Sequence, residues 1–173
     1  NYAEAHYSLG CSLNKIGQSE KAILSFKKAI RCNPDHIHAQ YNLARNFLAI
    51  DDFKNGWKGY EYRQGKDIFL YYEKSGIAKQ KIWDGKKFEG RLFVHAEQGI
   101  GDEILYSSIF SDLSNYHKNL YVLANSRLIE IYIRSFPNIK FLNKKEKLQY
   151  NNSAKHILLG SLGQYFRRTK KDF

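Results

Sequence analysis

Apolar residues in the first part of the chain recur at the spacing of amphipathic helices. Leu9 and Leu13 lie one helical turn apart, as do Phe26 and Ile30, so each pair shares a helix face. The pattern also repeats when the sequence is compared with itself at a shift of 34 residues. At that shift the following residues coincide: Ala5 with Ala39, Tyr7 with Tyr41, Leu9 with Leu43, Leu13 with Phe47, Ile23 with Trp57, and Phe26 with Tyr60. We therefore expect two similar helical units in tandem.

A 34-residue period with two helices in each unit is that of the tetratricopeptide repeat. In the first unit the small residues Gly10 and Ala22 let the paired helices approach closely, and Pro34 ends the second helix because proline cannot continue it. The second unit is atypical, since Gly56 and Arg63 replace alanines of the first. Atypical repeats are common at the ends of a stack.

Residues 1–66 are thus predicted to hold two tetratricopeptide repeats. Because about three repeats are normally needed for a stable stack, we expect further repeats before Asn1 in a longer parent protein. The concave face of such a stack can hold a peptide in the manner of a helical groove. The candidate polar contacts for a protein partner on that face are Asn14, Asn42, Arg45 and Asn46.

After residue 88 the rhythm changes to short apolar runs that alternate with helical patterns. We predict strands at Leu92–Ala96, Leu120–Ala124, Lys140–Leu142 and His156–Leu159, and helices at Gly101–Tyr116, Ser126–Phe136 and Leu162–Arg168. Strands that alternate with helices predict a parallel sheet of βαβ units. The predicted fold class is α plus α/β: tetratricopeptide helices in 1–66, a linker or cap in 67–88, and a partial Rossmann-like parallel α/β domain in 89–173. A polar loop is expected from Lys144 to Asn152.

The stretch Arg91–Asp102 holds the densest candidate chemistry. A strand, a glycine turn and a helix form the floor of ligand sites in α/β sheets, where ligands bind outside the carboxyl ends of the strands. The glycines permit positive φ and close approach of a ligand, and the first helical amides can hold an anionic group. The candidate residues are Glu97, Gln98, Gly99, Gly101 and Asp102. His95, at the strand end, is expected to be a satisfied core histidine.

Two interpretations of Asp102 stay open. Its carboxylate can act as a general base that accepts a proton from an acceptor hydroxyl. It can also be a helix N-terminal carboxylate, stabilised by the helix dipole and the free amides. Glu97 and Gln98 have the same ambiguity, since they can contact a ligand or hydrogen-bond the loop in place.

Composition narrows the classes of partner. The net charge of +11 would suit nucleic acid, but the basic residues are scattered among abundant Asn, Ile, Tyr and Phe, so nucleic-acid binding is not predicted. The chain has no apolar run long enough to span a membrane. Cys11 and Cys32 form neither a metal site nor a disulfide framework, which favours the reducing cytoplasm, with peripheral attachment to the inner membrane still compatible. No metal or cofactor is predicted, and Gly-Ile-Gly lacks the third glycine of an NAD site.

Two stretches together resemble a bacterial family in which tetratricopeptide repeats precede a glycosyltransferase module. The last repeat of that family carries the pattern GW..YEWR, which GWKGYEYR matches here from Gly56 to Arg63. Its next domain opens with W.G..l.G..l.v..EQG.GD, which Trp83-Asp84-Gly85 and the later EQGIGD match. The turn at Trp83 is expected to anchor the second domain. Tyr62 stands where the family usually has tryptophan, and Glu103–Ser108 lacks an arginine that the family commonly has in that helix.

The resemblance implies the N-terminal portion of a heptosyltransferase-like glycosyltransferase of the GT-B type, inactive as this portion alone. Such an enzyme transfers a sugar from a nucleotide-sugar donor to an envelope or protein acceptor by direct displacement, without a metal. Asp102 matches the presumed general base of that group. The alternative is a non-catalytic scaffold whose repeats mediate protein–protein interaction.

Overall fold

The computed structural model describes residues 2–65, 68–74, 76–78, 81–146 and 153–173. The chain forms two compact units: Asn1–Tyr71 together with Arg167–Phe173, and Tyr72–Phe166. Each unit has its own buried core. Within the described ranges, no helix is both long enough and apolar enough to cross a membrane.

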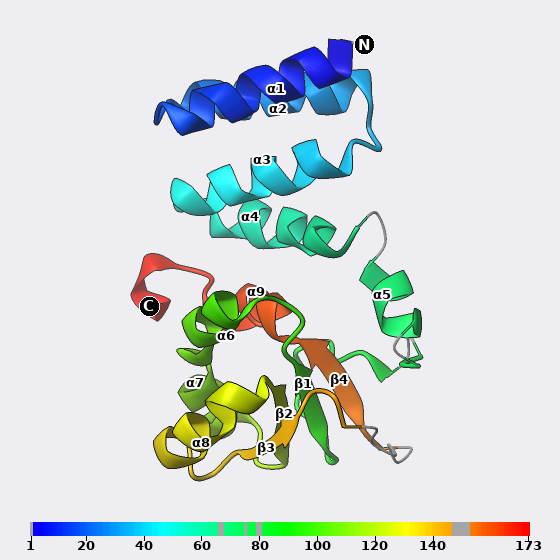
Figure 1. Ribbon diagram of the computed structural model, residues 1–173, viewed down its shortest axis with the longest axis vertical. Coiled ribbons are helices and arrows are strands. Elements are labelled where there is room, and N and C mark those ends of the chain that lie inside the picture. Colours follow the sequence, from blue (N-terminus) through cyan, green and yellow to red (C-terminus); the bar gives the residue numbers. More distant parts are fainter. Residues whose placement is uncertain (1, 66–67, 75, 79–80, 147–152) are drawn as a thin grey trace. The chain divides into compact units, whose positions relative to one another are not determined.

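The first unit consists of antiparallel helix pairs. These are α1 (Tyr2–Lys15) with α2 (Ser19–Cys32), and α3 (Ile37–Ala49) with α4 (Phe53–Tyr60), while α2 also contacts α3 (Figure 1). A 3₁₀ turn (Glu61–Gln64) follows α4, and α5 spans Ile68–Lys74. The inter-helix turns keep the 34-residue period, because Gly17 has φ +75° and its counterpart Asp51 has φ +64°. The predicted two-helix units are confirmed.

Close helix packing in the first unit depends on small residues. Ala22, Phe26, Ala29 and Ala39 form a fully buried cluster. A Cβ built on Gly10 would lie 2.6 Å from Cε1 of Phe26, so only glycine lets α1 approach this ring. The predicted role of Gly10 is thereby confirmed.

The C-terminal segment Arg167–Phe173 belongs to the first unit. The indole N–H of Trp57 on α4 donates to the carbonyl of Arg167, and the Phe53 and Phe173 rings lie 5.5 Å apart between centroids. Lys170 Nζ lies 2.6 Å from Asp51 Oδ2. The predicted α/β domain, 89–173, included this segment, whereas the structure groups it with the repeats because its contacts are made there.

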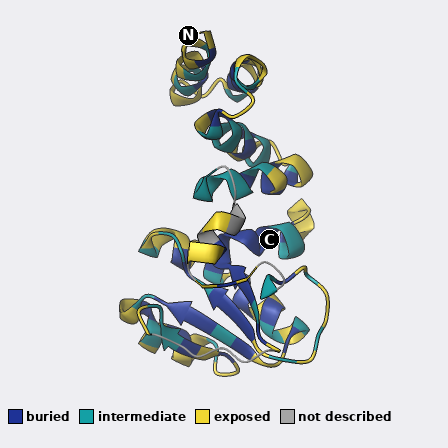
Figure 2. Ribbon diagram, turned by 90° about the vertical axis from the view of Figure 1, so that its right-hand side faces the viewer, coloured by how far each residue is buried: buried dark blue, intermediate teal, exposed yellow. Residues whose placement is uncertain are grey.

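The second unit contains a four-stranded, all-parallel sheet. Its strands are β1 (Leu92–His95), β2 (Leu120–Ala124), β3 (Lys140–Asn143) and β4 (Lys155–Leu158), in the order β3-β2-β1-β4. Each observed strand agrees with a predicted one to within one residue at either end. The predicted α plus α/β arrangement is thus confirmed at the level of helical repeats followed by a parallel sheet. Figure 2 shows the strands as mostly buried.

The helices α6 (Ile100–Ser107), α7 (Phe110–Tyr116) and α8 (Ser126–Ser135) pack on one face of the sheet (Figure 1). Phe110 of α7 and Tyr132 of α8 contact Phe141 of β3. The register places Phe141 beside Val122, and Val122 beside Val94, so these three residues share the helix-covered face.

A single helix was predicted for Gly101–Tyr116, and this is wrong, because the chain turns between α6 and α7. The Ser107 hydroxyl donates to the carbonyl of Ile104 at 2.7 Å, and the Ser108 amide bonds three residues back to Leu105. A serine hydroxyl that takes a helical carbonyl in this way competes with the α-helical pattern. The predicted helix Leu162–Arg168 is also shorter than expected, since α9 covers Gly163–Phe166.

The predicted turn at Trp83 is anchored in the second unit. The Trp83 backbone amide donates to the carbonyl of His156 on β4, and its indole N–H donates to the carbonyl of Lys86. Gly85 has φ +83°, and a Cβ there would clash with the Tyr165 ring. Glycine is therefore required at this position for two reasons. Of the predicted polar loop, residues 147–152 lie outside the described residues.

Candidate functional site

The turn from β1 to α6 lies at a change of direction in the sheet. From β1 the chain crosses to β2 and β3 on one side, and β4 lies on the other. In open parallel sheets a crevice forms at this point, outside the carboxyl ends of the two strands where the order reverses. The Glu97–Asp102 turn follows the carboxyl end of β1 and therefore lies at such a point.

Gly99 and Gly101 have backbone conformations that any residue can adopt. Gly99 is the residue before α6, with φ −68° and ψ 167°, and Gly101 lies within the first turn of the helix. Neither has a positive φ, so the conformational freedom that these glycines permit is not used here. A Cβ on Gly101 would have no atom within 4 Å among the described residues, and one on Gly99 would meet only Asp102 Oδ2 at 3.6 Å. The fold itself thus does not demand glycine at these two positions.

Asp102 is the third residue of α6, and its side chain is exposed. The residue before this helix, Gly99, has no side chain with which to cap it. The backbone N–H groups of the first helical turn have no partner within the helix, and the dipole favours a carboxylate beside them. The exposed carboxylate is also accessible to a hydroxyl group outside the sheet. The structure therefore places Asp102 where either interpretation is possible.

Glu97 and Gln98 are partly buried and lie beside each other. Gln98 Nε2 is 3.5 Å from Glu97 Oε1, which is at the long limit for a hydrogen bond. Both residues follow β1 at the carboxyl edge of the sheet. The substrate-contact prediction for these two side chains remains a prediction.

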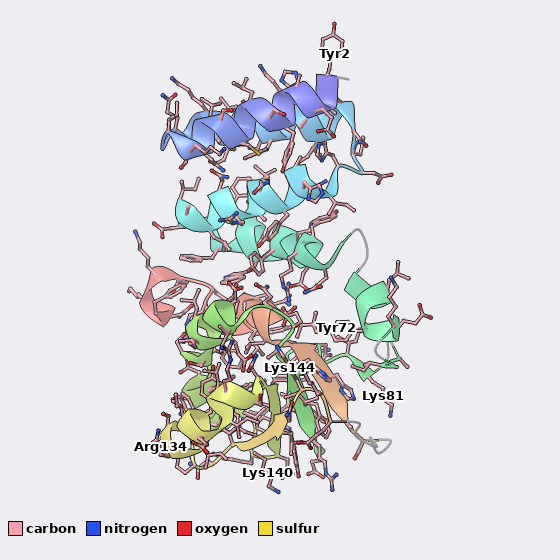
Figure 3. All side chains as sticks on the ribbon, in the orientation of Figure 1. Tyr2, Tyr72, Lys81, Arg134, Lys140 and Lys144 are labelled. Atoms are coloured by element: carbon pink, nitrogen blue, oxygen red, sulfur yellow. The ribbon has the colours of Figure 1, made fainter. Side chains whose placement is uncertain are left out.

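A buried carboxylate, Glu103, connects the carboxyl ends of three strands. Its side chain is 1% exposed, and Oε1 accepts a hydrogen bond of 2.9 Å from the backbone N–H of Asn125, which follows β2. Lys144, which follows β3, places Nζ 3.9 Å from Glu103 Oε2 and 3.3 Å from the carbonyl of Ala96, which follows β1. Figure 3 labels Lys144 in the sheet unit. Sequence reasoning missed both Glu103 and Lys144.

Keeping the buried Glu103 carboxyl ionised costs free energy. Burial raises the pKa of its carboxyl above the ordinary value, and the hydrogen bond from Asn125 and the charge of Lys144 only partly oppose this shift. Burial also raises the pKa of the neighbouring Tyr132 to about 12, with the Glu103 carboxylate as a further cause. Glu103 therefore acts as a structural link beneath the candidate turn, next to the exposed Asp102.

Two histidines pair across neighbouring strands on the sheet face opposite α6–α8. His95 Nε2 lies 3.0 Å from His156 Nδ1, and the Phe93 ring stacks on His156. Burial lowers the pKa of His95 to about 3, with His156 as a further cause. Burial lowers the pKa of His156 to about 4, with the charge of Lys81 as a further cause. The expectation that His95 is a satisfied histidine is confirmed by this contact, although its side chain is half-buried and not fully in the core, and its partner His156 was not foreseen.

The predicted partner-binding residues of the repeats differ in accessibility. Asn14 on α1 and Arg45 on α3 are exposed, and the Arg45 guanidinium lies over the Tyr41 ring at 5.8 Å. Asn42 is half-buried and donates to the Tyr7 hydroxyl at 3.3 Å. Asn46 is only 4% exposed, and its amide donates to the carbonyl of Asn42 at 2.8 Å. The prediction for Asn46 is therefore corrected, because a buried amide that bonds its own helix offers little to a partner.

Across the described ranges, no group of three or more His, Cys, Asp or Glu side chains is arranged to hold a metal ion. The basic run at the C-terminus, which is Arg167, Arg168, Lys170 and Lys171, lies in a segment with specific contacts. Besides the Lys170 ion pair, the Arg167 guanidinium lies over the Phe173 ring at 5.6 Å, and the Asp172 carboxylate accepts from the amides of Arg168 and Thr169.

Comparison with known proteins supports the repeat assignment. The tetratricopeptide-repeat family model matches residues 3–36. Protein FlbA of Caulobacter vibrioides is 24% identical over 149 residues, which make up 81% of this chain and 24% of that protein. The chain thus spans about a quarter of the length of this curated relative. No solved structure matches the chain.

Proposed function

We propose that this chain binds a protein partner through its repeats. The observation that carries the proposal is the tetratricopeptide match over residues 3–36, because stacks of such repeats present an extended concave surface to peptides. Of the predicted contacts, Asn14, Asn42 and Arg45 are accessible or partly so. An exposed guanidinium beside amide groups favours a peptide with carboxylates, since arginine binds carboxylates through paired hydrogen bonds.

The test selects peptides from a displayed random library with the full chain and measures their affinity by calorimetry. Selected peptides should be enriched in Asp and Glu. Arg45→Ala should lower their affinity about tenfold, as expected for the loss of a charged hydrogen bond. Lys58→Ala, at an exposed lysine of α4, is the matched control and should leave the affinity unchanged. Equal weakening by both substitutions, or by neither, would show that the binding face lies elsewhere.

A second candidate function is that of a glycosyltransferase, with the α/β unit as a Rossmann-like half of a GT-B fold. The observation that favours it is the strand order β3-β2-β1-β4, which brings the EQGIGD turn to the change of direction in the sheet. The surroundings of Gly101 also favour this function. Among the described residues nothing would contact a side chain at this position, so close approach of a ligand to the backbone can explain the glycine.

In this proposal Asp102 is the general base. Its carboxylate accepts the proton of an acceptor hydroxyl as the hydroxyl oxygen attacks the anomeric carbon of the donor sugar. The new glycosidic bond forms while the bond between the sugar and the nucleoside diphosphate breaks, and the diphosphate leaves with the electron pair. The amides of the first turn of α6 suit an anionic group of a substrate, which the helix dipole attracts.

The test uses the natural protein at its full length. A panel of nucleotide sugars is titrated while thermal stability is followed, and donor hydrolysis is measured for the native protein, Asp102→Asn and Gly101→Ala. A selective stabilisation, together with hydrolysis that collapses in Asp102→Asn, would support the transferase. Gly101→Ala should fold at least as stably as the native protein, because alanine favours a helix by about 1 kcal/mol over glycine, yet lose activity if a ligand approaches this position. The absence of any donor effect would leave the protein-binding function alone.

A further inference from the structure

Basic residues gather at the amino edge of the parallel sheet. Arg91 directly precedes β1, and Lys140 and Lys155 are the first residues of β3 and β4. Lys118 lies shortly before β2. Because the four strands are parallel, their first residues meet at one edge, where neighbouring strands lie about 4.8 Å apart. Charges that are scattered in the sequence therefore form a row, the basic edge, which consists of Arg91, Lys118, Lys140 and Lys155.

The Tyr121 ring on β2 positions two of these cations. The Arg91 guanidinium lies 5.7 Å and the Lys140 ammonium 5.1 Å from the centroid of this ring. Lys140 also donates a hydrogen bond of 3.2 Å to the Tyr121 hydroxyl. Both basic residues are exposed, and within the described ranges neither pairs with a carboxylate. The two charges are thus held in place and remain available to an anion outside the protein.

The other two residues of the basic edge have partners of their own. Lys155 Nζ lies 5.0 Å from the centroid of the Phe88 ring and 3.6 Å from Asp84 Oδ1. The exposed Lys118 places Nζ 3.5 Å from the carbonyl of Ser114 in α7, where a cation complements the helix C-terminus. These contacts account for Lys155 and Lys118 in structural terms, so Arg91 and Lys140 are the basic residues that the fold itself does not explain.

The carboxyl edge of the sheet has the opposite character. Figure 3 shows Lys140 and Lys144 near opposite edges of the sheet, at the two ends of β3. Acidic residues predominate among the charged residues that follow the strands, which are Glu97, Asp102, Glu103, Lys144, Lys145 and Glu146. The sheet unit is therefore polarised, and an unequal charge distribution of this kind orients a protein with its basic side towards an anionic surface.

We propose that the basic edge docks on the surface of a membrane that contains anionic lipids. Arg91 and Lys140 are its main contacts, since each exposed lysine or arginine near such a surface is attracted by the lipid phosphates. The net charge of +11 adds to this attraction. Docking at this edge leaves the Glu97–Asp102 turn at the far edge of the sheet, away from the bilayer. The proposal depends on neither of the two proposed functions.

Two observations favour lipid head groups over nucleic acid. Single-stranded nucleic acid binds in a positively charged groove and stacks its bases on aromatic rings. The Tyr121 ring is already stacked on Phe93, at 5.0 Å between centroids, and carries two cations. The register also places Lys140 on the sheet face of Phe93 and Lys155 on the other face, so the charges do not line one groove.

The test measures the partition of the full chain onto vesicles by flotation. The vesicles contain phosphatidylglycerol and phosphatidylcholine in equal parts, and pure phosphatidylcholine is the neutral reference. The chain should bind only the anionic vesicles, and should leave them when salt rises from about 0.1 M to about 1 M, because the Debye length then falls from about 10 Å to about 3 Å. Arg91→Gln together with Lys140→Gln should lower the partition coefficient about thirtyfold, as expected for the loss of two basic residues near an anionic surface.

The matched control is Lys27→Gln together with Arg31→Gln, which removes the same charge from exposed positions of α2. Lys27 resembles Lys140 in lying over an aromatic ring, that of Phe47, at 5.4 Å. The control should change the partition coefficient less than about twofold, because charges away from the docking surface are screened by salt. The proposal is overturned if the anionic vesicles do not bind the chain, or if the two double variants weaken binding equally.

Two further measurements use the native protein. Acetylation of lysines with and without anionic vesicles should show protection of Lys140 but not of Lys145, which is exposed after β3 at the carboxyl edge. Equal protection of both lysines would overturn the proposed orientation. A labelled single-stranded RNA is titrated in parallel. If RNA binds more tightly than the vesicles and protects Lys140 in the same way, the partner is nucleic acid and the proposal is wrong.

Discussion

Acidification from pH 7 to pH 5 should destabilise the sheet unit through the His95–His156 pair. Burial holds the pKa of His95 at about 3 and that of His156 at about 4, whereas an unfolded histidine has a pKa of about 6.5. Between pH 6.5 and the folded-state values, the unfolded chain binds more protons than the folded chain. The stability that the uncharged histidines contribute is therefore fully present above pH 6.5. Below that value the free energy of unfolding falls as the pH falls.

The magnitude follows from linkage. Consider one histidine whose pKa is about 6.5 in the unfolded chain and about 4 in the folded chain. Its protonation lowers the free energy of unfolding by about 1.8 kcal/mol between pH 7 and pH 5. Two independent histidines would lose about 3.6 kcal/mol. Because Nε2 of His95 and Nδ1 of His156 lie 3.0 Å apart, a single added proton can be held between them, which reduces the loss. The expected loss is therefore about 2 to 4 kcal/mol.

The assay is urea unfolding at pH 7, 6 and 5, followed by fluorescence in a Trp57→Phe background, where Trp83 is the only tryptophan and reports the sheet unit. The variants His95→Gln and His156→Gln should each flatten the pH dependence. A residual slope is expected from His117, whose pKa burial also lowers. A free energy of unfolding that is constant within about 0.5 kcal/mol, or that rises towards pH 5, would refute the reasoning.

Two further predictions concern the repeat unit. Gly10→Ala should destabilise this unit by about 1 kcal/mol. The added Cβ is forced against the buried Phe26 ring, which costs about 1–3 kcal/mol, while alanine favours the helix by about 1 kcal/mol over glycine. In a thermal melt, Phe26→Leu in the same chain should relieve the loss. Trp57→Phe should speed amide hydrogen exchange in α4 about tenfold, because the Arg167 carbonyl loses its donor, whereas Lys170→Ala should change exchange less than about twofold, since its ion pair is largely exposed. Equal effects of Trp57→Phe and Lys170→Ala would contradict this ranking.

The sequence allowed most of the elements to be predicted, because their signals are local. Apolar runs located the four strands, and the 34-residue shift located the helix pairs. The break between α6 and α7 was not predictable from periodicity, because the apolar residues Tyr106, Phe110 and Leu113 continue at helical spacing across it. The return of Arg167–Phe173 to the repeats was missed for a different reason. Its anchor, the bond from the Trp57 indole, joins residues far apart in the sequence, and a basic run by itself indicates only a solvated surface.

The sequence did contain the information that separates the roles of the neighbouring carboxylates Asp102 and Glu103. Glu103, Tyr106, Phe110 and Leu113 are spaced i, i+3, i+7 and i+10, so Glu103 falls on the apolar stripe and Asp102 does not. Burial on that stripe commits Glu103 to the Asn125 amide and to Lys144, while Asp102 stays exposed. Substitution of an exposed residue usually changes the free energy of unfolding by less than about 0.5 kcal/mol. Disruption of a buried, hydrogen-bonded charge lowers it by roughly 3 to 5 kcal/mol. Loss of activity in Asp102→Asn would therefore report chemistry, and loss in a Glu103 variant would first have to be separated from loss of the fold.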